Sequence, residues 1–405
     1  MIVNARDWQR PPLKDSEVVE QQVKDILADI KANGQKAINA YAQKFDGSAP
    51  EVIELKPFDD YDLPSALKQS IKTAAKRIER FADFQRQQLK GADYSDDTGT
   101  YAQVITPIER AGCYIPGGRY PLISTALMTL IPARVAGVET RIACSPSDHP
   151  AILAAASLAG ATEFLKLGGA QAIAALAYGN PYVGDGQPVD IIVGPGNAYV
   201  NEAKRQLQGV VKIDGLAGPS ELMALCDGKQ PIEWLAYDAL AQAEHDPDAL
   251  SILVSDDRKW LEEMLSFLSA ESFRGLLDDQ QVQLVLAENT RELMTFSESY
   301  AAEHLMLCHA GIQPKQLSQY GSLFVGAISA VALGDYISGP NHTLPTSGYA
   351  RQTGGLNAMT FLKVQTVQTL TDSGREILSA AAMPLAEAEG LMHHYASLSV
   401  RLNND

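Results

Sequence analysis

The stretch RIACSPSDHPAILAAASLAGATEFLKLGGAQAIAALAYG, residues 141–179, decides the fold class. Short apolar runs alternate in it with Ala-rich segments: RIACSPS is typical of a strand, PAILAAASLAGA of a helix, EFLKLGG of a strand and AQAIAALAYG of a helix. The next apolar run, VDIIVGPG, leads into a helical pattern, NAYVNEAKRQL. Strands that alternate with helices in this way predict a parallel sheet with helices on its faces.

The same order recurs further along the chain. ELMALCDG (221–228), IEWLAYDALAQAEH (232–245) and LSILVSDD (250–257) repeat strand, helix and strand, which predicts a second α/β unit. Residues 16–89 instead carry apolar side chains at the three- and four-residue spacing of helices, with Gly34 as a break. The tail beyond Gln352 is rich in Ala, Leu and Glu, and we expect one helix over 383–395.

Composition narrows the class of protein. The 405 residues are 46% apolar, enough for more than one core. With 49 acidic against 33 basic residues, a net charge of −16 and no Lys/Arg cluster to neutralise phosphates, we expect no nucleic acid partner. The most apolar long segment, 122–137, is interrupted by Pro132 and Arg134, so we expect no membrane span. The four cysteines show no CxxC spacing and the first residues form no secretory signal, which predicts a cytoplasmic protein.

Three loops place Gly beside Pro or Gly next to strand-like runs: YIPGGRYP (114–121), LGGAQ (167–171) and GPGN (194–197). Open α/β sheets admit ligands at the carboxyl ends of their strands, where such loops lie. None of the loops matches G-x-G-x-x-G, and glycine is common at plain strand-to-helix turns. A nucleotide or phosphate site and ordinary turns are therefore both open on this pattern.

Gln242 and His245 lie near the end of the helix expected over 232–245, on or beside its apolar stripe. Their ligand atoms would point inward together where Asp246 and Pro247 stop the helix. The alternative is an ordinary surface or capping histidine.

Further polar groups that could join them occur elsewhere, and several of the seven histidines stand among polar residues rather than on apolar faces. Two imidazoles, a carboxylate and an amide oxygen suit a divalent ion such as zinc, with manganese or cobalt as alternatives. Helical spacing pairs Glu389 with His393 rather than with His394. The candidates are Asp335, His342, Glu303, His304, Glu389, His393 and His394.

Eight segments, in this order, resemble the histidinol dehydrogenase family over nearly the whole chain. They are YIPGGRYPLISTALM, KLGGAQAIAALAYG, VDIIVGPGNAYVNEAKRQL, IDGLAGPSELMALCD, DALAQAEHDPDA, AAEHL, GDYISGPNHTLPTSG and AEGLMHH. The resemblance implies an NAD-dependent, zinc-containing enzyme that oxidises L-histidinol through the aldehyde to L-histidine, with two hydride transfers to two NAD. It also implies an α/β fold of two Rossmann-like parallel-sheet domains, a helical N-terminal region and a small C-terminal dimerisation segment.

The resemblance assigns roles by position. It implies a metal site of Gln242, His245, Asp335 and His394, which favours His394 over His393. Glu303 and His304 resemble the catalytic pair. The implied substrate contacts are Ser220, His342 and Glu389, together with His304 and the metal ligands. One residue from each glycine loop matches an NAD contact: Tyr114, Gln171 and Asn197.

An intertwined homodimer with shared active sites is also implied, in which the C-terminal segment of one chain completes the site of the other. The corresponding division of the chain is an N-terminal arm over 1–22, a first α/β domain over 23–112 plus 222–352, and an NAD-binding Rossmann-like domain over 113–221. The C-terminal segment is then 353–405.

Some features leave alternatives open. AAEHL lacks the more usual Pro before Glu303, and GGRYPL and TGGLNAM resemble relatives that oxidise other small diols, including a sulfonated propanediol. The substrate could therefore be another amino alcohol or that diol, for which Arg119 is the nearest cation. A catalytically silent metal-binding homologue is a third hypothesis. Locally, Glu303-His304 fits a surface turn, Ser220 a helix N-cap, and Cys113 a buried apolar residue more readily than an aldehyde trap.

Overall fold

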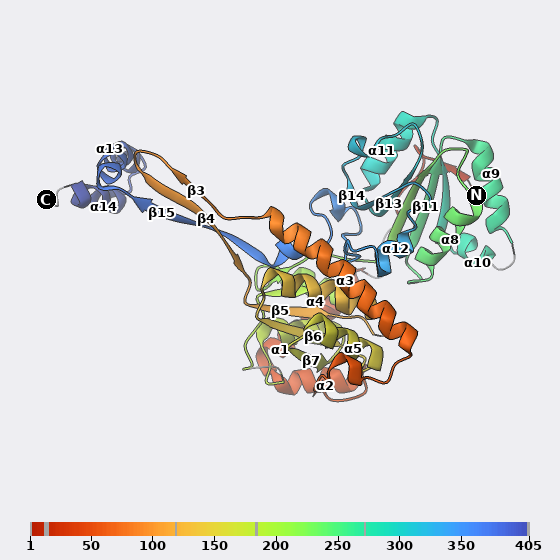
Figure 1. The fold of residues 1–405 in the computed structure, drawn as a ribbon, viewed down its shortest axis with the longest axis horizontal. Coiled ribbons are helices and arrows are strands. Elements are labelled where there is room, and N and C mark those ends of the chain that lie inside the picture. The colour runs from red at the N-terminus through yellow and green to blue at the C-terminus, as the bar shows by residue number, and fades with distance from the viewer. Residues whose placement is uncertain (1, 12–15, 118–119, 183–184, 271–272, 403–405) are drawn as a thin grey trace. The chain divides into compact units, whose positions relative to one another are not determined.

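The computed structural model describes residues 2–11, 16–117, 120–182, 185–270 and 273–402, which form two compact units (Figure 1). Unit 1 comprises Met1–Phe84 and Ile108–Phe361, and unit 2 comprises Gln85–Pro107 and Leu362–Asp405. Unit 1 contains two six-stranded sheets, here called sheets A and B, and unit 2 contains a three-stranded sheet, sheet C. The predicted α/β fold class is confirmed; the predicted domain boundaries stay a prediction.

The stretch 141–179 contributes β6 and β7 to sheet B, which has the strand order β2-β7-β6-β5-β8-β9. β2 runs antiparallel to β7, and every other neighbouring pair is parallel. Its strands are β2 (Glu51–Val52), β5 (Arg110–Tyr114), β6 (Thr140–Ser145), β7 (Glu163–Lys166), β8 (Ile191–Val193) and β9 (Lys212–Ile213). The helices between them are α4 (Ile123–Ala136), α5 (Pro150–Ala159), α6 (Gly169–Tyr178) and α7 (Ala198–Gln206). The alternation predicted from the sequence is therefore present.

The N-terminal helices share the core of sheet B. α1 (Ser16–Asn33) and α2 (Gln35–Phe45) are separated at Gly34, as predicted, and α1 packs on α6 and α7. Val23 and Ile30 of α1 and Ile173 of α6 are buried in one cluster. α3 (Ser65–Gln88) follows, and short 3-10 turns lie at Phe58–Asp60, Pro314–Gln316, Tyr349–Arg351 and Ala358–Phe361.

Sheet A is parallel throughout, with the order β1-β12-β11-β10-β13-β14. Its strands are β1 (Ile2–Asn4), β10 (Glu221–Cys226), β11 (Leu250–Ser255), β12 (Val282–Leu286), β13 (Ala302–Cys308) and β14 (Tyr320–Val325). Its helices are α8 (Ile232–Ala243), α9 (Arg258–Leu268), α10 (Arg274–Asp278), α11 (Thr290–Tyr300) and α12 (Val331–Tyr336). The sequence did not predict β1, which brings the first residues of the chain to the edge of this sheet.

Both faces of sheet A are covered. Along β10, Leu222 and Ala224 belong to the cluster under α8 and α9, whereas Met223 and Leu225 belong to the cluster that includes Phe296 of α11. Successive side chains on a strand point to opposite faces, so a strand buried on both sides is apolar almost throughout. A charged residue in such a strand is consequently exceptional.

Unit 2 is built on sheet C, which is antiparallel with the order β15-β4-β3. β3 (Ala92–Ser95) and β4 (Gly99–Pro107) pair with β15 (Leu362–Leu370), and α13 (Asp372–Ala388) and α14 (Met392–Leu402) follow. The single helix predicted over 383–395 is wrong, because the chain turns at Gly390 with a φ of 72° between two helices. A hollow of about 500 Å³ lies along the three strands.

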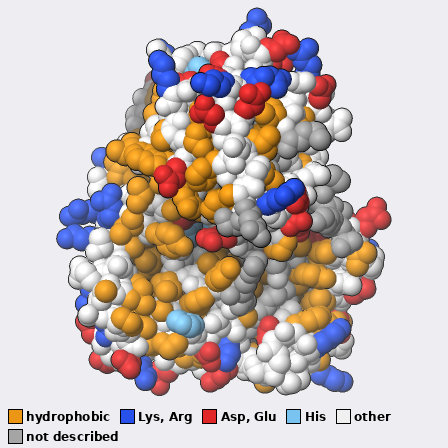
Figure 2. Space-filling model, turned by 90° about the vertical axis from the view of Figure 1, so that its right-hand side faces the viewer, with side chains coloured by type: hydrophobic (Ala, Val, Ile, Leu, Met, Phe, Trp, Pro, Cys, Tyr) orange, Lys and Arg blue, Asp and Glu red, His pale blue; other side chains and the backbone are white. Residues whose placement is uncertain are grey.

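The surface mixes apolar and charged side chains. Figure 2 shows hydrophobic side chains across the middle of one face, with basic and acidic side chains interspersed toward its upper and lower ends. Among the helices of the described ranges, none has the length and apolar character needed to cross a membrane.

Candidate active site

Glu303 and His304 stand at the amino end of β13, after a backbone turn at Ala301 with a φ of 55°. Both side chains are buried, with exposures of 5% and 4%. The surface-turn hypothesis for this pair is therefore wrong. Because burying a charged group is unfavourable unless it is paired, the site must contain partners for both.

One residue of the neighbouring strand supplies a contact to each of them. The backbone N–H of Glu221 donates to Glu303 Oε2 at 2.6 Å, and His304 Nδ1 lies 3.2 Å from the Glu221 carbonyl oxygen. Since a carbonyl oxygen only accepts, Nδ1 carries a hydrogen. Nε2 of His304 is then the nitrogen that can gain or lose a proton, and it lies 3.4 Å from Asp335 Oδ1.

The imidazole of His304 lies between two carboxylates, because Nδ1 is also 3.4 Å from Glu303 Oε2. Burial lowers the pKa of His304, but the nearby charges and hydrogen bonds of Glu303 and Asp335 outweigh burial and raise it well above its usual value. Burial raises the pKa of Asp335, yet its hydrogen bond with His304 and the histidine charges lower it overall. The arrangement is that of an acid–base group held by anions.

His342 lies on the other side of Asp335. Its Nδ1 is 2.7 Å from the Asp335 carbonyl oxygen and its Nε2 is 3.1 Å from Thr125 Oγ1, so Nδ1 donates and Nε2 accepts. Burial lowers the pKa of His342, which favours the neutral ring. The segment between Asp335 and His342 is held by Arg77 of α3, which donates to the carbonyl oxygens of residues 337 and 338 at 2.7 and 3.2 Å.

Gln242 and His245 lie at the end of α8 as predicted, although the helix itself ends at Ala243. Gln242 is only 3% exposed, and its side-chain nitrogen has no hydrogen-bond partner in the described part of the chain. A buried amide without a partner is unfavourable, and amide N and O assignments are interchangeable. His245 is exposed, and its charge contributes to lowering the pKa of Asp335. An amide, an imidazole and a carboxylate are a donor set that suits a divalent ion.

The fourth predicted ligand lies in the other unit. His394 and His393 are exposed on α14, and Glu389 is exposed at the end of α13. The described ranges contain no group of three or more His, Cys, Asp or Glu side chains arranged to hold a metal ion. Of the four predicted ligands, unit 1 thus contains Gln242, His245 and Asp335, and the fourth belongs to unit 2.

The glycine loops of sheet B follow the carboxyl ends of β5, β7 and β8. Gly194 has a φ of 113°, and a Cβ there would lie 2.1 Å from the Tyr114 carbonyl oxygen, so only glycine fits. A buried ion pair holds this residue: Lys204 Nζ donates to the Gly194 carbonyl at 2.9 Å and lies 2.5 Å from Asp214 Oδ1. Asp214 Oδ2 accepts from the Gly194 N–H at 2.8 Å.

The three predicted NAD contacts are already engaged within the chain. Tyr114 is buried and its hydroxyl accepts from the Gly169 N–H at 3.2 Å, and Gln171 donates to Asp46 Oδ2 at 3.4 Å. Asn197 Oδ1 accepts from the N–H groups of residues 199 and 200, each at 3.1 Å, and so caps α7. Among the described residues, no hydrogen bond uses the amide nitrogen of Asn197, which lies at the start of that helix.

Other expectations are resolved by local structure. Ser220 is not a helix N-cap, because the next residue, Glu221, begins strand β10. Cys113 is fully buried and burial raises its thiol pKa to about 12, so it is protonated and fits the apolar role. Arg119, the cation considered for a sulfonate, lies outside the described residues.

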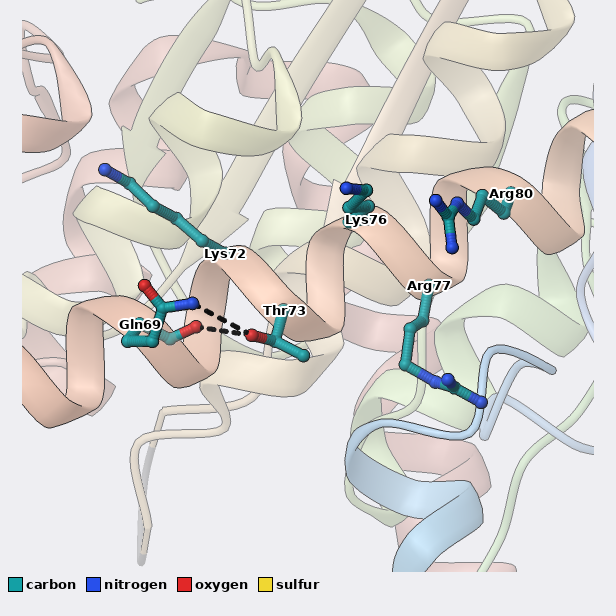
Figure 3. A pocket seen from close by; sticks show the side chains of 6 residues that line it. All are labelled: Gln69, Lys72, Thr73, Lys76, Arg77 and Arg80. Carbon is teal, nitrogen blue, oxygen red and sulfur yellow. Dashed lines mark hydrogen bonds between the residues drawn. The ribbon is translucent and has the colours of Figure 1, made fainter.

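A separate hollow of about 390 Å³ lies along α3 (Figure 3). Four cationic side chains line it, and Lys72 is 2.7 Å from Asp59. No predicted site residue lines it; its lining is Gln69, Lys72, Thr73, Lys76, Arg77 and Arg80. Through Arg77 the hollow adjoins the segment that leads to His342.

Three features of the site were not found from the sequence. Glu221 and the Lys204–Asp214 pair hold the site residues and the glycine loop, and Arg10 forms an ion pair with Glu221. For Glu221 a signal existed, since it is the one acid in the apolar run ELMALC. Arg10 carries no comparable local signal.

Comparison with known proteins gives concordant matches. The sequence model of the family described as histidinol dehydrogenase matches residues 9–402. The histidinol dehydrogenase of Thermus thermophilus is 42% identical over 412 residues, covering 98% of each chain. That of Methanothermobacter thermautotrophicus is 39% identical, covering 94% of this chain and 93% of its own. The crystal structure of histidinol dehydrogenase from Elizabethkingia anophelis superposes with a TM-score of 0.85 at 33% identity, covering 98% and 97% of the two chains.

Proposed function

From the premise that the chain belongs to the histidinol dehydrogenase family and is an NAD-dependent dehydrogenase, we propose that it oxidises L-histidinol through the aldehyde to L-histidine. Two hydride transfers to two NAD would complete the reaction. The observation that carries this proposal is the buried imidazole of His304 between the carboxylates of Glu303 and Asp335. A base that is fixed on both sides suits a reaction in which two oxidations each release a proton.

The chain's own residues divide the proton chemistry. In its neutral form, His304 takes the hydroxyl proton through Nε2 in the first oxidation, while Nδ1–H stays bonded to the Glu221 carbonyl. The aldehyde must then add water, and Glu303 accepts the proton of that water because its carboxylate lies next to the imidazole. Once His304 has released the first proton to solvent, it takes the proton of the hydrate in the second oxidation. The redox chemistry itself is supplied by NAD.

Gln242, His245 and Asp335 would hold a divalent ion, with zinc first and manganese or cobalt as alternatives. When bound, the ion would supply a fixed positive charge that orients the nitrogen ligands of the substrate. The amide nitrogen of Gln242, which has no hydrogen-bond partner among the described residues, supports this role. His342, which holds the backbone of Asp335, and Ser220, next to Glu221, would contact the substrate beside Glu303 and His304.

Tyr114, Gln171 and Asn197 would line the NAD site at the carboxyl ends of β5, β7 and β8. Support comes from two helices of this half, α6 and α7, which begin directly at the glycine loops. The N-terminus of a helix presents backbone N–H groups that favour the pyrophosphate of a dinucleotide.

His394 and Glu389 would serve the site of a second copy in a homodimer with shared active sites. α14 has no buried residue, and the tail exposes large apolar side chains such as Leu391, Met392 and Val400. Exposed apolar side chains of this kind are stabilised when a partner covers them. His394 would then be the further ligand, and Glu389 a substrate contact, supplied by the other chain.

The test is an NADH assay with L-histidinol before and after chelation. We expect two NADH for each L-histidinol, loss of activity on chelation and recovery on addition of zinc. His304→Asn should lower turnover by about 10²- to 10⁴-fold with little change in substrate binding. His245→Asn should lose metal content and substrate binding together. His309→Asn is the matched control, because His309 follows the opposite end of β13 and pairs with Asp256.

Full turnover in His304→Asn, or normal metal content in His245→Asn, would contradict the assigned roles. NADH formation from a sulfonated propanediol but not from L-histidinol would replace the substrate. Metal binding without NAD reduction on any alcohol would indicate a silent homologue. The relatives that cover the chain nearly end to end are histidinol dehydrogenases, which does not favour the sulfonated diol.

A further inference from the structure

The N-terminal segment reaches the catalytic pair by a defined route. β1 pairs with β12 at the edge of sheet A, and Trp8 packs on the rings of Phe296 and Tyr300 of α11, with centroids 5.3 and 5.6 Å apart. Trp8 Nε1 also donates to Gln283 Oε1 at 2.6 Å. These contacts fix the backbone just before Arg10, so its side chain starts from a defined position.

Arg10 holds two elements of sheet A at once. Its Nη2 donates to the Tyr300 carbonyl at 2.7 Å, and its guanidinium lies 3.9 Å from the centroid of the Tyr300 ring. Its Nη1 forms an ion pair with Glu221 Oε1. Tyr300 is the last residue of α11, where unpaired carbonyls favour a cation, and β13 begins two residues later. Arg10 therefore joins the start of β13 to the start of β10.

The carboxylate that Arg10 holds belongs to the residue whose backbone orients the catalytic pair. The Glu221 N–H donates to Glu303 and the Glu221 carbonyl accepts from His304. Moving the Glu221 backbone would alter both contacts together. A displacement of about 1 Å at a reacting group can lower a rate by roughly 10²-fold.

Glu221 is unlike the rest of its strand. Its side chain is 8% exposed, and burial with the charge of Glu303 raises its pKa to about 7 while Arg10 opposes that change. An apolar residue would fill this position without desolvating a charge. An acid at this position is explained if its carboxylate serves to bind Arg10 and so to fix the Glu221 backbone.

We propose that Arg10 and Glu221 are positioning residues for Glu303 and His304: the guanidinium fixes the Glu221 carboxylate and the end of α11, and thereby the backbone that orients both groups. The inference rests on the proposed function of that pair. It gives Arg10, near the start of the chain, a role in turnover that leaves the metal and NAD residues untouched.

The test compares Arg10→Ala with Arg6→Ala. Arg6 lies in the same segment but pairs with Glu288, and both side chains are more than half exposed. Arg10→Ala should lower kcat about 10- to 100-fold with KM for L-histidinol and NAD and the metal content nearly unchanged. Added methylguanidinium should restore part of kcat, because the Arg10 side chain is 31% exposed and its site is reachable. Arg6→Ala should retain full activity.

Arg10→Lys controls for a folding defect, because it keeps the positive charge but cannot contact Glu221 and the Tyr300 carbonyl through two separate nitrogens. We expect its kcat to lie between those of the wild type and Arg10→Ala. Unchanged kcat in a folded Arg10→Ala protein would overturn the inference, as would equal loss in Arg6→Ala. Loss of metal or a large rise in KM without rescue would also overturn it, because it would indicate general unfolding.

His304→Asn in the same assay separates this inference from the proposed function. If His304→Asn keeps its turnover, the role of the pair fails; if it loses turnover while Arg10→Ala does not, only the positioning role fails. An activity-independent readout is the ¹⁵N spectrum of the ring nitrogens, with the His304 signals assigned by their loss in His304→Asn. At a pH above the raised pKa of His304, where the ring is neutral, the Nδ1–H tautomer should dominate in the wild-type protein and lose that preference in Arg10→Ala.

Discussion

Gly194 beside sheet B and Glu221 in sheet A each use both their backbone N–H and their backbone carbonyl to contact charged side chains, but the roles of backbone and side chain are reversed. At Gly194, the charged side chains of Lys204 and Asp214 hold the backbone. At Glu221, the backbone holds the charged side chains of Glu303 and His304. The first arrangement follows the carboxyl end of β8, and the second lies at the amino ends of β10 and β13.

This difference distinguishes charged groups that stabilise the fold from charged groups that take part in the reaction. A buried ion pair that fixes a glycine loop leaves no reactive side chain on the loop, which suits binding a ligand close to the backbone. A backbone that fixes side chains holds the carboxylate and the imidazole in place, and His304 Nε2, which lies 3.4 Å from Asp335, is the atom that exchanges a proton. Charge removed beside sheet B should therefore change stability, whereas charge removed in the sheet A site should change turnover.

The largest expected effect is the loss of the Lys204–Asp214 pair. Lys204→Met leaves the Asp214 carboxylate buried without its cation, and removing one partner of a buried pair costs about 3–5 kcal/mol. The measurement is the free energy of unfolding by denaturant. Arg205→Met is the control, because Arg205 lies on the same helix, half exposed, and pairs with Glu202 at the surface. Its cost should be below about 1 kcal/mol, and equal losses in the two variants would contradict the supporting role of the buried pair.

Gly194→Ala should have the next effect. A Cβ there would clash with the Tyr114 carbonyl oxygen and occupy a strained φ, at a cost of about 1–3 kcal/mol. Because the loop must move, KM for NAD should rise more than KM for L-histidinol. Gly209→Ala is the matched control, since Gly209 has a φ of 94° with nothing within 4 Å of the added Cβ. A similar rise in KM for NAD in both variants would argue against a role of this loop in binding NAD.

Glu303→Gln probes the sheet A side. The amide oxygen can still accept from the Glu221 N–H, and one of two neighbouring carboxylates is removed, so the unfolding free energy should change by less than about 1 kcal/mol. Oxidation of the aldehyde should fall about 10²- to 10⁴-fold, because water activation loses its base. The measurement is the ratio of aldehyde to acid after single-turnover mixing. A loss of stability as large as that of Lys204→Met would remove the distinction between the two halves.

The strand–helix alternation of both sheets was predictable from the sequence because each element has its own apolar pattern. Buried parallel strands such as β6 and β10 read as short apolar runs, and their helices follow with a different period. The sequence of a helix or strand does not show which other element it packs against or pairs with. That α1 packs on α6, and that β1 joins sheet A, depend on contacts across more than 100 residues of sequence.

The site divides in the same way. Helical position indicated that Gln242 points inward, whereas the family resemblance assigned the roles of Glu303, His304 and Asp335, and the local pattern at Glu303 and His304 also fitted a surface turn. The residues that hold them were not indicated. Glu221 acts through its backbone, which no sequence pattern reports, and Arg10 lies 211 positions away from the acid that it holds. Supporting contacts of this kind become visible only when the strands are placed side by side.

Asp238 of α8 offers the smallest test of the comparison. Like Glu303, Asp238 is an acid of the sheet A half that accepts a hydrogen bond from a backbone N–H, here that of Val331. Asp238 is half-buried and lies outside the site. Burial raises its pKa to about 6. The folded protein therefore holds a proton on Asp238 that the unfolded chain has already lost between about pH 4 and 6, and stability from this group falls as the pH rises through that window.

Asp238→Asn removes this loss while keeping an acceptor for the Val331 N–H. At pH 8 the variant should be more stable than the wild type by about 1 kcal/mol, a value reduced for the partial exposure of the group, and at pH 4 the two should be equal. Denaturant unfolding at the two pH values measures the difference, with NADH turnover as the check that the site is intact. A variant less stable than the wild type at pH 8 would mean that the Asp238 carboxylate stabilises the fold, as Asp214 does. The difference between the sheet A and sheet B halves would then be limited to the contacts of Glu221.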